Sequence, residues 1–398
     1  MEFIDLHTQQ QRISQKIEAN IKTVLKHGQY IMGPEIKELE SKLASYVGIK
    51  YALGCASGTD ALLLALMALG AGPGDAIFTS PFTFIATAEA ICLLGATPIF
   101  VDIDARTFNI DPEKLEKAII ALKNNDKSIY PLPLTPYSSH LTSKRLTSPS
   151  SPLTPKGIIA VDLFGLLADY DAIQTIAQKH GLWIIEDAAQ SFGAECKGEK
   201  ACSFGSIACT SFFPAKPLGC YGDGGMCFTH DERTASLMGS IRLHGQGDNK
   251  YENIRIGING RLDTIQAAIL LAKFEIFPEE IEIRQEIARR YTNLLTPHPS
   301  IVPPHIPPGF KSAWAQYSIM ARDGKHRSML QAKLNDSGIP TAIYYPKPLH
   351  MQEAFVQMGY REGDFPLSED CAARIFSLPM HPYLKAEVQE KIIQILKS

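Results

Sequence analysis

The sequence lacks a long hydrophobic run, a closely spaced cysteine pair and an excess of charge of one sign. No stretch approaches the ~18 apolar residues that cross a bilayer, so we predict no membrane-spanning segment and no membrane partner. The chain has 39 Lys and Arg against 42 Asp and Glu, a net charge of -3. This balance argues against nucleic-acid binding by bulk electrostatics.

The cysteines and the first residues indicate the compartment. The 8 cysteines are scattered, and none belongs to a C-x-x-C pair. In a chain of this size that distribution predicts neither a disulfide framework nor a metal site. The segment MEFIDLHTQQQ has an acid at its second residue and no apolar core, so it is not typical of a secretory signal. We therefore expect a cytoplasmic protein.

Strands and helices are predicted to alternate through the first half of the chain. The length of 398 residues suggests two or three domains, and 45% hydrophobic with 20% charged residues is ordinary for a globular protein. The predicted strands are near-continuous apolar runs, typical of a parallel sheet that is covered on both faces, so the fold class is α/β. They are AIFTS (76–80), TPIFVDI (97–103), GIIAVDL (157–163) and LWIIEDA (182–188).

The pattern changes after residue 230. A helix over 231–245 precedes a long helix that starts near Leu262 and is interrupted at Pro278. Further along, we expect a strand over 312–321, a helix over 326–338, a strand over 341–346 and two final helices. These features predict a large domain over residues 1–270 and a smaller α+β domain over residues 271–398.

One stretch interrupts the alternation. Residues 131–155 contain six Pro, six Ser, four Thr and no acid. Such a composition favours neither a helix nor a sheet, so we predict a surface insertion over residues 124–156. Deleting residues 131–155 is expected to leave folding intact, as thermal unfolding and gel filtration would test. Aggregation of the shortened protein would contradict this.

Two charged residues stand in unusual surroundings. Asp187 ends an apolar strand and is followed by small residues, so its side chain can face a ligand at the carboxyl edge of the sheet. Taken alone, such an acid is equally often a helix cap. Lys216 lies among Phe, Pro and Leu in SFFPAKPLGCYGDGG. Because apolar neighbours disfavour a charged amine, this lysine is a candidate for covalent binding of an aldehyde.

A third segment is suited to a phosphate. Ser57, Gly58 and Thr59 open a predicted helix, where backbone N–H groups and hydroxyls can bind an anion, although a simple helix cap is the commoner role. The chain has neither a G-x-G-x-x-G after a strand nor a P-loop. A phosphate cradle, a carboxylate and an apolar-flanked lysine together suit pyridoxal phosphate.

These motifs identify a family resemblance. The sequence resembles the DegT/StrS sugar-nucleotide aminotransferases through GPEIKELE, SGTDALLLAL, FTFIATAEAI, GATPIFVDID, EDAAQSFGA, SFFPAKPLGCYGDGG, INGRLDTIQAAI and SLPMHPYL. The resemblance implies the aspartate-aminotransferase-like fold, type I of the pyridoxal-phosphate enzymes. Within the family, it is closest to aminotransferases that act on a UDP-linked 3-keto-N-acetylglucosaminuronic acid in O-antigen biosynthesis.

The resemblance also implies residue roles. Lys216 would bind the cofactor aldehyde, Asp187 would pair with the ring nitrogen, Gln190 would lie near the ring hydroxyl and Phe84 would stack on the ring. Phosphate groups would be bound by Gly58, Thr59, Ser211 and, from a second subunit of a homodimer, Asn259. Substrate contacts would come from Arg261, Tyr344, Tyr345 and His350.

The reaction implied has two halves. An amino acid, expected to be L-glutamate, converts the cofactor to pyridoxamine phosphate, which then aminates a keto-sugar nucleotide. Two alternatives are a sugar dehydratase of the same family and a non-catalytic sensor that binds the cofactor. The dehydratase branch carries His at the lysine position, so Lys216 argues against it. Leu166 and Tyr344 differ from the residues that we expect at these positions in relatives. The identity of the sugar substrate is therefore left open.

Overall fold

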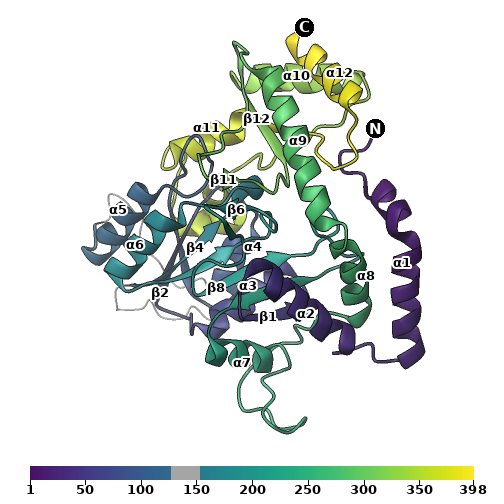
Figure 1. Ribbon diagram of the computed structural model, residues 1–398. Coiled ribbons are helices and arrows are strands. Elements are labelled where there is room, and N and C mark those ends of the chain that lie inside the picture. The colour runs from purple at the N-terminus through teal and green to yellow at the C-terminus, as the bar shows by residue number, and fades with distance from the viewer. Residues whose placement is uncertain (127–152) are drawn as a thin grey trace.

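The computed structural model describes residues 1–126 and 153–398, and its largest sheet has seven strands with helices on both faces (Figure 1). The strand order is β1-β9-β8-β5-β4-β2-β3. Neighbouring strands from β8 to β3 are parallel, whereas β9 is antiparallel to both β1 and β8. The strands span Tyr51–Cys55 (β1), Asp75–Thr79 (β2), Thr97–Phe100 (β3), Thr154–Val161 (β4), Trp183–Asp187 (β5), Ile207–Ser211 (β8) and Gly225–Thr229 (β9).

Two layers of helices cover this sheet because each strand carries apolar side chains on both faces. One apolar core includes residues of α2, α5, α6 and α8, and a second core on the other face includes residues of α3, α4 and α7. The helices span Pro34–Val47 (α2), Gly58–Ala68 (α3), Ala86–Leu93 (α4), Pro112–Lys123 (α5), Tyr170–His180 (α6), Glu232–Ile241 (α7) and Thr264–Phe274 (α8).

The chain from Ile283 to Leu396 supplies the residues of a third apolar core, around which a smaller unit forms. Its sheet has the order β10-β12-β13, and a separate small sheet has the order β11-β6-β7. The strands of these two sheets and the helices of this part of the chain are Glu195–Cys196 (β6), Glu199–Lys200 (β7), Phe277–Leu295 (α9), Ile301–Val302 (β10), Phe310–Lys311 (β11), Tyr317–Ala321 (β12), Gly324–Asp336 (α10), Pro366–Arg374 (α11), Ile375–Leu378 (β13) and Ala386–Lys397 (α12). The chain division at residue 270 stays a prediction.

Several sequence expectations need correction. Residues 341–346 form no strand and pair with the sheet only through the single bridge from Ala342 to Ser377. Strand β13, which the sequence did not predict, pairs with β12. Within the expected strand 312–321, only Tyr317–Ala321 is extended and paired, since Trp314 has a positive φ of 50°. Residues 154–156 belong to β4, and residues 127–152 of the predicted insertion lie outside the described residues.

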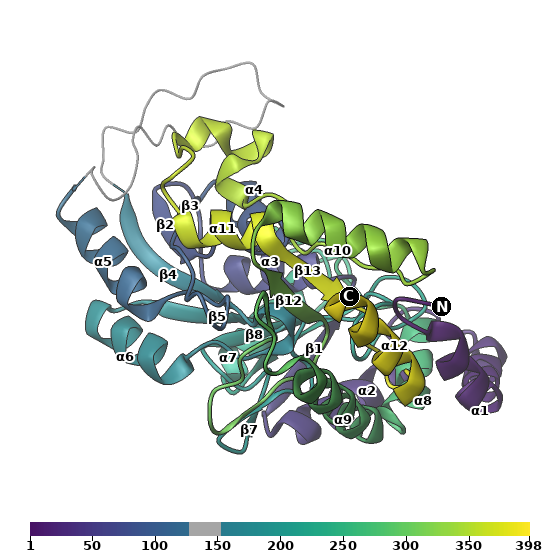
Figure 2. The ribbon, with the colours of Figure 1, turned by 90° about the horizontal axis from the view of Figure 1, so that it is seen from above.

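Helix α1 (Leu6–His27) was not predicted because its sequence is rich in Gln and other polar residues. It lies beside α8, where Ile17 packs with Ile269 and Ala272 (Figures 1 and 2). Asp5 caps its first turn by accepting the Thr8 N–H at 2.9 Å. Within residues 1–126 and 153–398, no helix has both the length and the apolar character needed to cross a bilayer.

Candidate active site

The candidate residues gather at one edge of the seven-stranded sheet. Strands β1, β5 and β8 run in the same direction, because β9 is antiparallel to both β1 and β8, and β5 is parallel to β8. Their carboxyl ends therefore meet at one edge, the usual place for a ligand in an α/β sheet. This topology brings together the turn at Ser57, the carboxylate of Asp187 and the hydroxyl of Ser211.

The turn after β1 forms an anion cradle at the start of α3. The Ser57 hydroxyl accepts the Asp60 N–H at 3.0 Å. The N–H groups of Gly58 and Thr59, at the start of the helix, are then available to bind an anion. A Cβ at position 58 would lie 2.7 Å from Ser211 Cβ, so only glycine fits there. The glycine thus lets the helix N-terminus approach Ser211 closely. The helix dipole adds a favourable field for a phosphate.

Asp187 is held in a fixed orientation at the end of β5. One carboxylate oxygen accepts the Thr87 hydroxyl at 2.8 Å, and the other accepts the Ala189 N–H at 3.3 Å. Burial raises the pKa of Asp187, while the Thr87 hydrogen bond, the Ala189 N–H and the charge of Lys216 act in the opposite direction. A buried carboxylate of this kind gains from a cationic partner, and a protonated ring nitrogen would supply one.

Lys216 follows β8 in a turn closed by its own N–H, which donates to the Phe213 carbonyl at 2.8 Å. Removal of the amine from water lowers its pKa to about 8, and the field of Asp187 opposes this shift. Among the described residues, no hydrogen bond to the Lys216 amine is found. The structure thus places an amine with a lowered pKa near the buried carboxylate, as expected for a group that binds an aldehyde.

Gln190 lies on the loop after β5, with its side chain oriented by two contacts. Its Oε1 accepts the Phe164 N–H at 2.9 Å, and its Nε2 donates to the Tyr345 hydroxyl at 3.3 Å. Phe84 is 56% exposed, and its ring centroid lies 6.4 Å from that of Tyr345. An exposed aromatic ring at the edge of a buried polar cluster leaves a face free to stack on a planar ligand.

The expected substrate residues Arg261, Tyr344, Tyr345 and His350 lie in three different places, and the expected phosphate ligand Asn259 lies with Arg261. Tyr344 and Tyr345 lie in the loop that replaces the predicted strand, and Tyr345 joins the cluster around Gln190. Asn259 is exposed, while the buried Nε of Arg261 has no hydrogen-bond partner within residues 1–126 and 153–398. Both line a pocket that also contains Ala56 of the anion cradle.

His350 is not brought together with the other site residues. It is buried among apolar side chains, with its Nε2 3.0 Å from a carboxylate oxygen of Glu369 and its ring 4.7 Å from that of Phe365. These contacts explain His350 as a structural residue that anchors the segment before α11. Leu166 is also buried and contributes to the apolar wall behind Phe164.

Sequence reasoning missed Thr87 and Phe164. Thr87 stands one helical turn after Phe84, so its hydroxyl can reach Asp187 only once α4 has packed beside β5. Phe164 has a positive φ of 59° and fixes Gln190 through its backbone. The only sequence feature that could have indicated Thr87 is its place, as a short polar residue, one turn after Phe84. Phe164 acts through its backbone N–H, which no side-chain pattern in the sequence can reveal.

The residues present fit pyridoxal phosphate. The cradle at Gly58 has space that any larger residue would fill. Among the described residues, the buried Asp187 has no cationic hydrogen-bond partner and the Lys216 amine has no hydrogen bond. A phosphate, a ring nitrogen and an aldehyde are the three groups that complete these sites.

The whole chain matches known proteins. The model of the DegT/DnrJ/EryC1/StrS aminotransferase family matches residues 11–397. The chain belongs to this family. It is 48% identical over 384 residues to the UDP-2-acetamido-2-deoxy-3-oxo-D-glucuronate aminotransferase of Pseudomonas aeruginosa, covering 96% of each chain.

Two solved structures superpose on this aminotransferase. A DegT/DnrJ/EryC1/StrS aminotransferase from Brucella abortus is 47% identical, has a TM-score of 0.90 and is covered to 98%, with 100% of this chain matched. NtdA from Bacillus subtilis, with bound pyridoxamine phosphate, is 29% identical with a TM-score of 0.84, covering 99% of this chain and 82% of that one. The protein is therefore a pyridoxal-phosphate-dependent aminotransferase of fold type I.

Proposed function

We propose that this aminotransferase moves the amino group of L-glutamate to the 3-position of UDP-linked 3-keto-N-acetylglucosaminuronic acid. The choice of sugar substrate is supported by the 48% identity to the relative from P. aeruginosa over nearly the full length of both chains. The glutamate donor rests on the resemblance alone. The product would serve lipopolysaccharide biosynthesis, and the cytoplasmic location stays a prediction.

The proposal assigns each half of the reaction to the same residues. Pyridoxal phosphate, when bound, supplies an electron sink for the carbon that loses its proton. Asp187 would hold a proton at the ring nitrogen and keep that sink effective. The Lys216 amine would bind the aldehyde at rest and carry a proton once displaced. The cradle at Gly58 and Thr59 would bind the phosphate, and Phe84 would keep the ring in one plane.

Two spectroscopic measurements test the proposal. L-glutamate added to the loaded enzyme should shift the visible absorbance toward the pyridoxamine form, whereas L-alanine at the same concentration should not. In the reverse direction, the stable UDP-linked 3-amino sugar with 2-oxoglutarate should yield glutamate. A response to L-glutamate without any response to the amino sugar would refute the assigned sugar substrate. If neither compound gives a response, the assignment of L-glutamate as amino donor is refuted as well.

We also propose that the active enzyme is a homodimer. The loop after α7 exposes large apolar side chains, with Tyr251 88%, Ile254 56% and Ile256 87% exposed. The same loop leads to Asn259, which is exposed in the protomer. Apolar side chains grouped in this way favour burial against another protein surface. A second copy of the chain would cover them and bring Asn259 to the neighbouring site.

Ile256→Asp is expected to weaken this dimer. An aspartate buried in an apolar interface without a partner is costly, so the dissociation constant should rise at least about tenfold. Light scattering coupled to gel filtration over a dilution series measures the change. Val302→Asp replaces another exposed aliphatic side chain, on β10, and should leave the oligomeric state unchanged. Equal behaviour of both variants would place the interface elsewhere.

The lowered pKa of Lys216 predicts a pH dependence for the cofactor-free protein. A pKa lowered from 10.5 to about 8 means that the amine is charged below pH 8 and neutral above it. At pH 8 about half of Lys216 should be neutral, against less than about 1% of an ordinary lysine. Brief acetylation between pH 6 and 10, followed by peptide mass spectrometry, should show labelling of Lys216 levelling off above pH 8. A continued rise to pH 10, as for surface lysines, would contradict the shift.

A further inference from the structure

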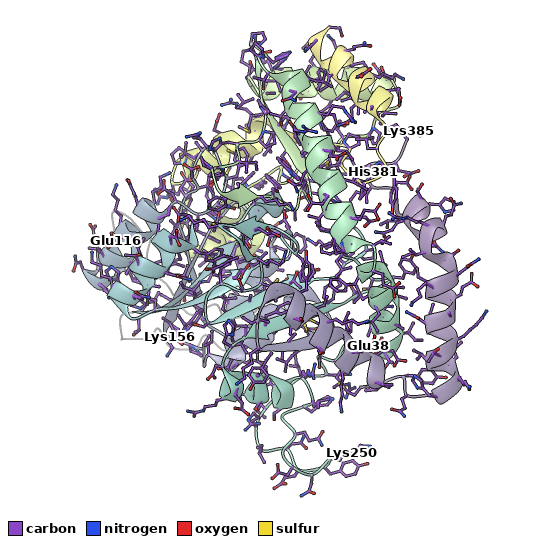
Figure 3. All side chains as sticks on the ribbon, viewed as in Figure 1. Glu38, Glu116, Lys156, Lys250, His381 and Lys385 are labelled. Atoms are coloured by element: carbon purple, nitrogen blue, oxygen red, sulfur yellow. The ribbon has the colours of Figure 1, made fainter. Side chains whose placement is uncertain are left out.

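The segment before α1 is fixed against the smaller unit. The Phe3 carbonyl accepts the Met380 N–H at 3.4 Å, and Asp5 also accepts the Thr8 hydroxyl at 2.6 Å. The next residue after Met380, His381, is buried, and burial lowers its pKa to about 4, so it is neutral at physiological pH. His381 lies between α9 and the first turn of α1 (Figure 3).

Helix α1 holds the segment in place from its other side. Gln9 donates to a Glu280 carboxylate oxygen at 2.7 Å, and Arg12 forms an ion pair with Glu279 at 2.5 Å. Glu280 also accepts the hydroxyl of Tyr383, which lies in the segment before α12. These contacts join α1 to α9 and to the chain after β13. Phe3 is therefore attached on both sides to parts of the fold that are themselves packed.

The Phe3 side chain packs against the loop that carries Tyr344 and Tyr345. Its ring centroid lies 6.4 Å from that of Tyr344, which in turn lies 6.0 Å from that of Tyr345. Tyr345 accepts the hydrogen bond from Gln190. Two aromatic contacts and one hydrogen bond thus connect Phe3 to Gln190, the residue expected beside the cofactor ring.

Besides the Phe3 ring, Tyr344 packs against Tyr345 and an apolar core that includes Met320. It is half-buried in a loop whose only bridge to a strand is at Ala342, and no hydrogen bond of its hydroxyl is found among the described residues. An aromatic neighbour restricts the rotamers of such a side chain. Loss of the Phe3 ring would leave one side of Tyr344 uncovered.

We propose that Phe3 is a positioning residue that sets the place of Tyr344 in the subsite for the sugar nucleotide. The inference rests on the proposed function and on the substrate contacts that the family resemblance implies for Tyr344 and Tyr345. L-glutamate is small and needs only the region near Lys216, whereas a nucleotide sugar extends farther from the reacting carbon. A displaced Tyr344 should therefore weaken binding of the sugar and leave the amino-acid half of the reaction unaffected.

The test measures the two half-reactions of Phe3→Ala separately. With the UDP-linked 3-amino sugar as amino donor, the half-saturating concentration should rise about three- to tenfold, the range for loss of one aromatic contact. With L-glutamate it should stay within about twofold of the unaltered enzyme. Phe3→Tyr keeps the ring and should restore sugar binding. Phe310→Ala removes another half-buried ring, on β11, and should affect neither substrate.

Hydrogen exchange of the holoenzyme gives a second readout that needs no sugar. Phe3→Ala should speed exchange in peptides covering residues 341–348 without changing peptides from α3. Equal losses for both substrates, or unchanged exchange at 341–348, would overturn the inference. If the unaltered enzyme fails to react with the amino sugar, the proposed function fails on that sugar. The exchange measurement then still decides the role of Phe3.

Discussion

Lys216→Ala will abolish transamination. Proton transfer by a positioned amine contributes about 10²–10⁴-fold, and the variant also loses the covalent attachment of the aldehyde, so the total loss should exceed about 10³-fold. Steady-state turnover with L-glutamate and a sugar acceptor, together with the visible absorbance of the protein mixed with pyridoxal phosphate, measures both losses. The fold should be retained, because the part of the chain that the structure describes makes no hydrogen bond to the Lys216 amine.

A second lysine provides a matched control. Lys273 on α8 is buried, its pKa is also lowered to about 8 by burial, and its amine lies 5.0 Å from the centre of the Tyr221 ring. Lys273→Met should keep the cofactor absorbance and at least half of the turnover, because this amine lies away from Asp187 and the anion cradle. Near-normal turnover in Lys216→Ala would refute the assignment of the catalytic amine.

Asp187→Asn will keep the fold and lose most of the activity. Asparagine has nearly the same shape and can still accept the Thr87 hydroxyl, but it cannot hold a charged ring nitrogen. Loss of one preorganised electrostatic contact typically costs about 10²–10³-fold in turnover. Single-turnover kinetics with L-glutamate would measure the effect, and thermal unfolding would check the fold.

Asp102→Asn is the control for Asp187→Asn, because it removes the charge of a buried carboxylate that lies outside the candidate site. Asp102 is equally buried, and it accepts the Ser368 N–H at 2.9 Å and the Ser368 hydroxyl at 2.6 Å. Its replacement should lower stability while turnover of the folded fraction stays within about threefold, because Asp102 has no described contact with the cluster around Asp187. Full activity in Asp187→Asn would mean that another group serves the ring nitrogen.

The sheet was predictable because its strands leave a clear pattern. Strands covered on both faces have little room for polar residues, so runs such as IIAV (158–161) and WIIE (183–186) mark them directly. The same reasoning failed at TAIYYP (341–346), whose aromatic and β-branched residues suit a strand equally well. The segment lies at the free edge of β13, but it pairs there only at the bridge from Ala342 to Ser377, so it does not become a strand.

The catalytic candidates were visible for a related reason. A lysine among Phe and Pro, or a carboxylate at the end of an apolar strand, is costly in a folded protein unless it has a purpose, so each stands out from its neighbours. Thr87, Phe164 and Phe3 have no such contrast with their surroundings. Their importance comes from partners about 100, 26 and 341 residues away in the sequence, namely Asp187, Gln190 and Tyr344.

The sequence by itself determined the fold class, the family and the three groups that suit pyridoxal phosphate. Each of these depends on residue types at short spacing, and local chemistry is enough to recognise them. Only the tertiary structure decided that His350 is held by Glu369 away from the site and that Thr87 orients Asp187. It also decided that residue 3 packs against the loop at Tyr344. Such contacts join distant segments, and their geometry exists only after the helices and strands have packed.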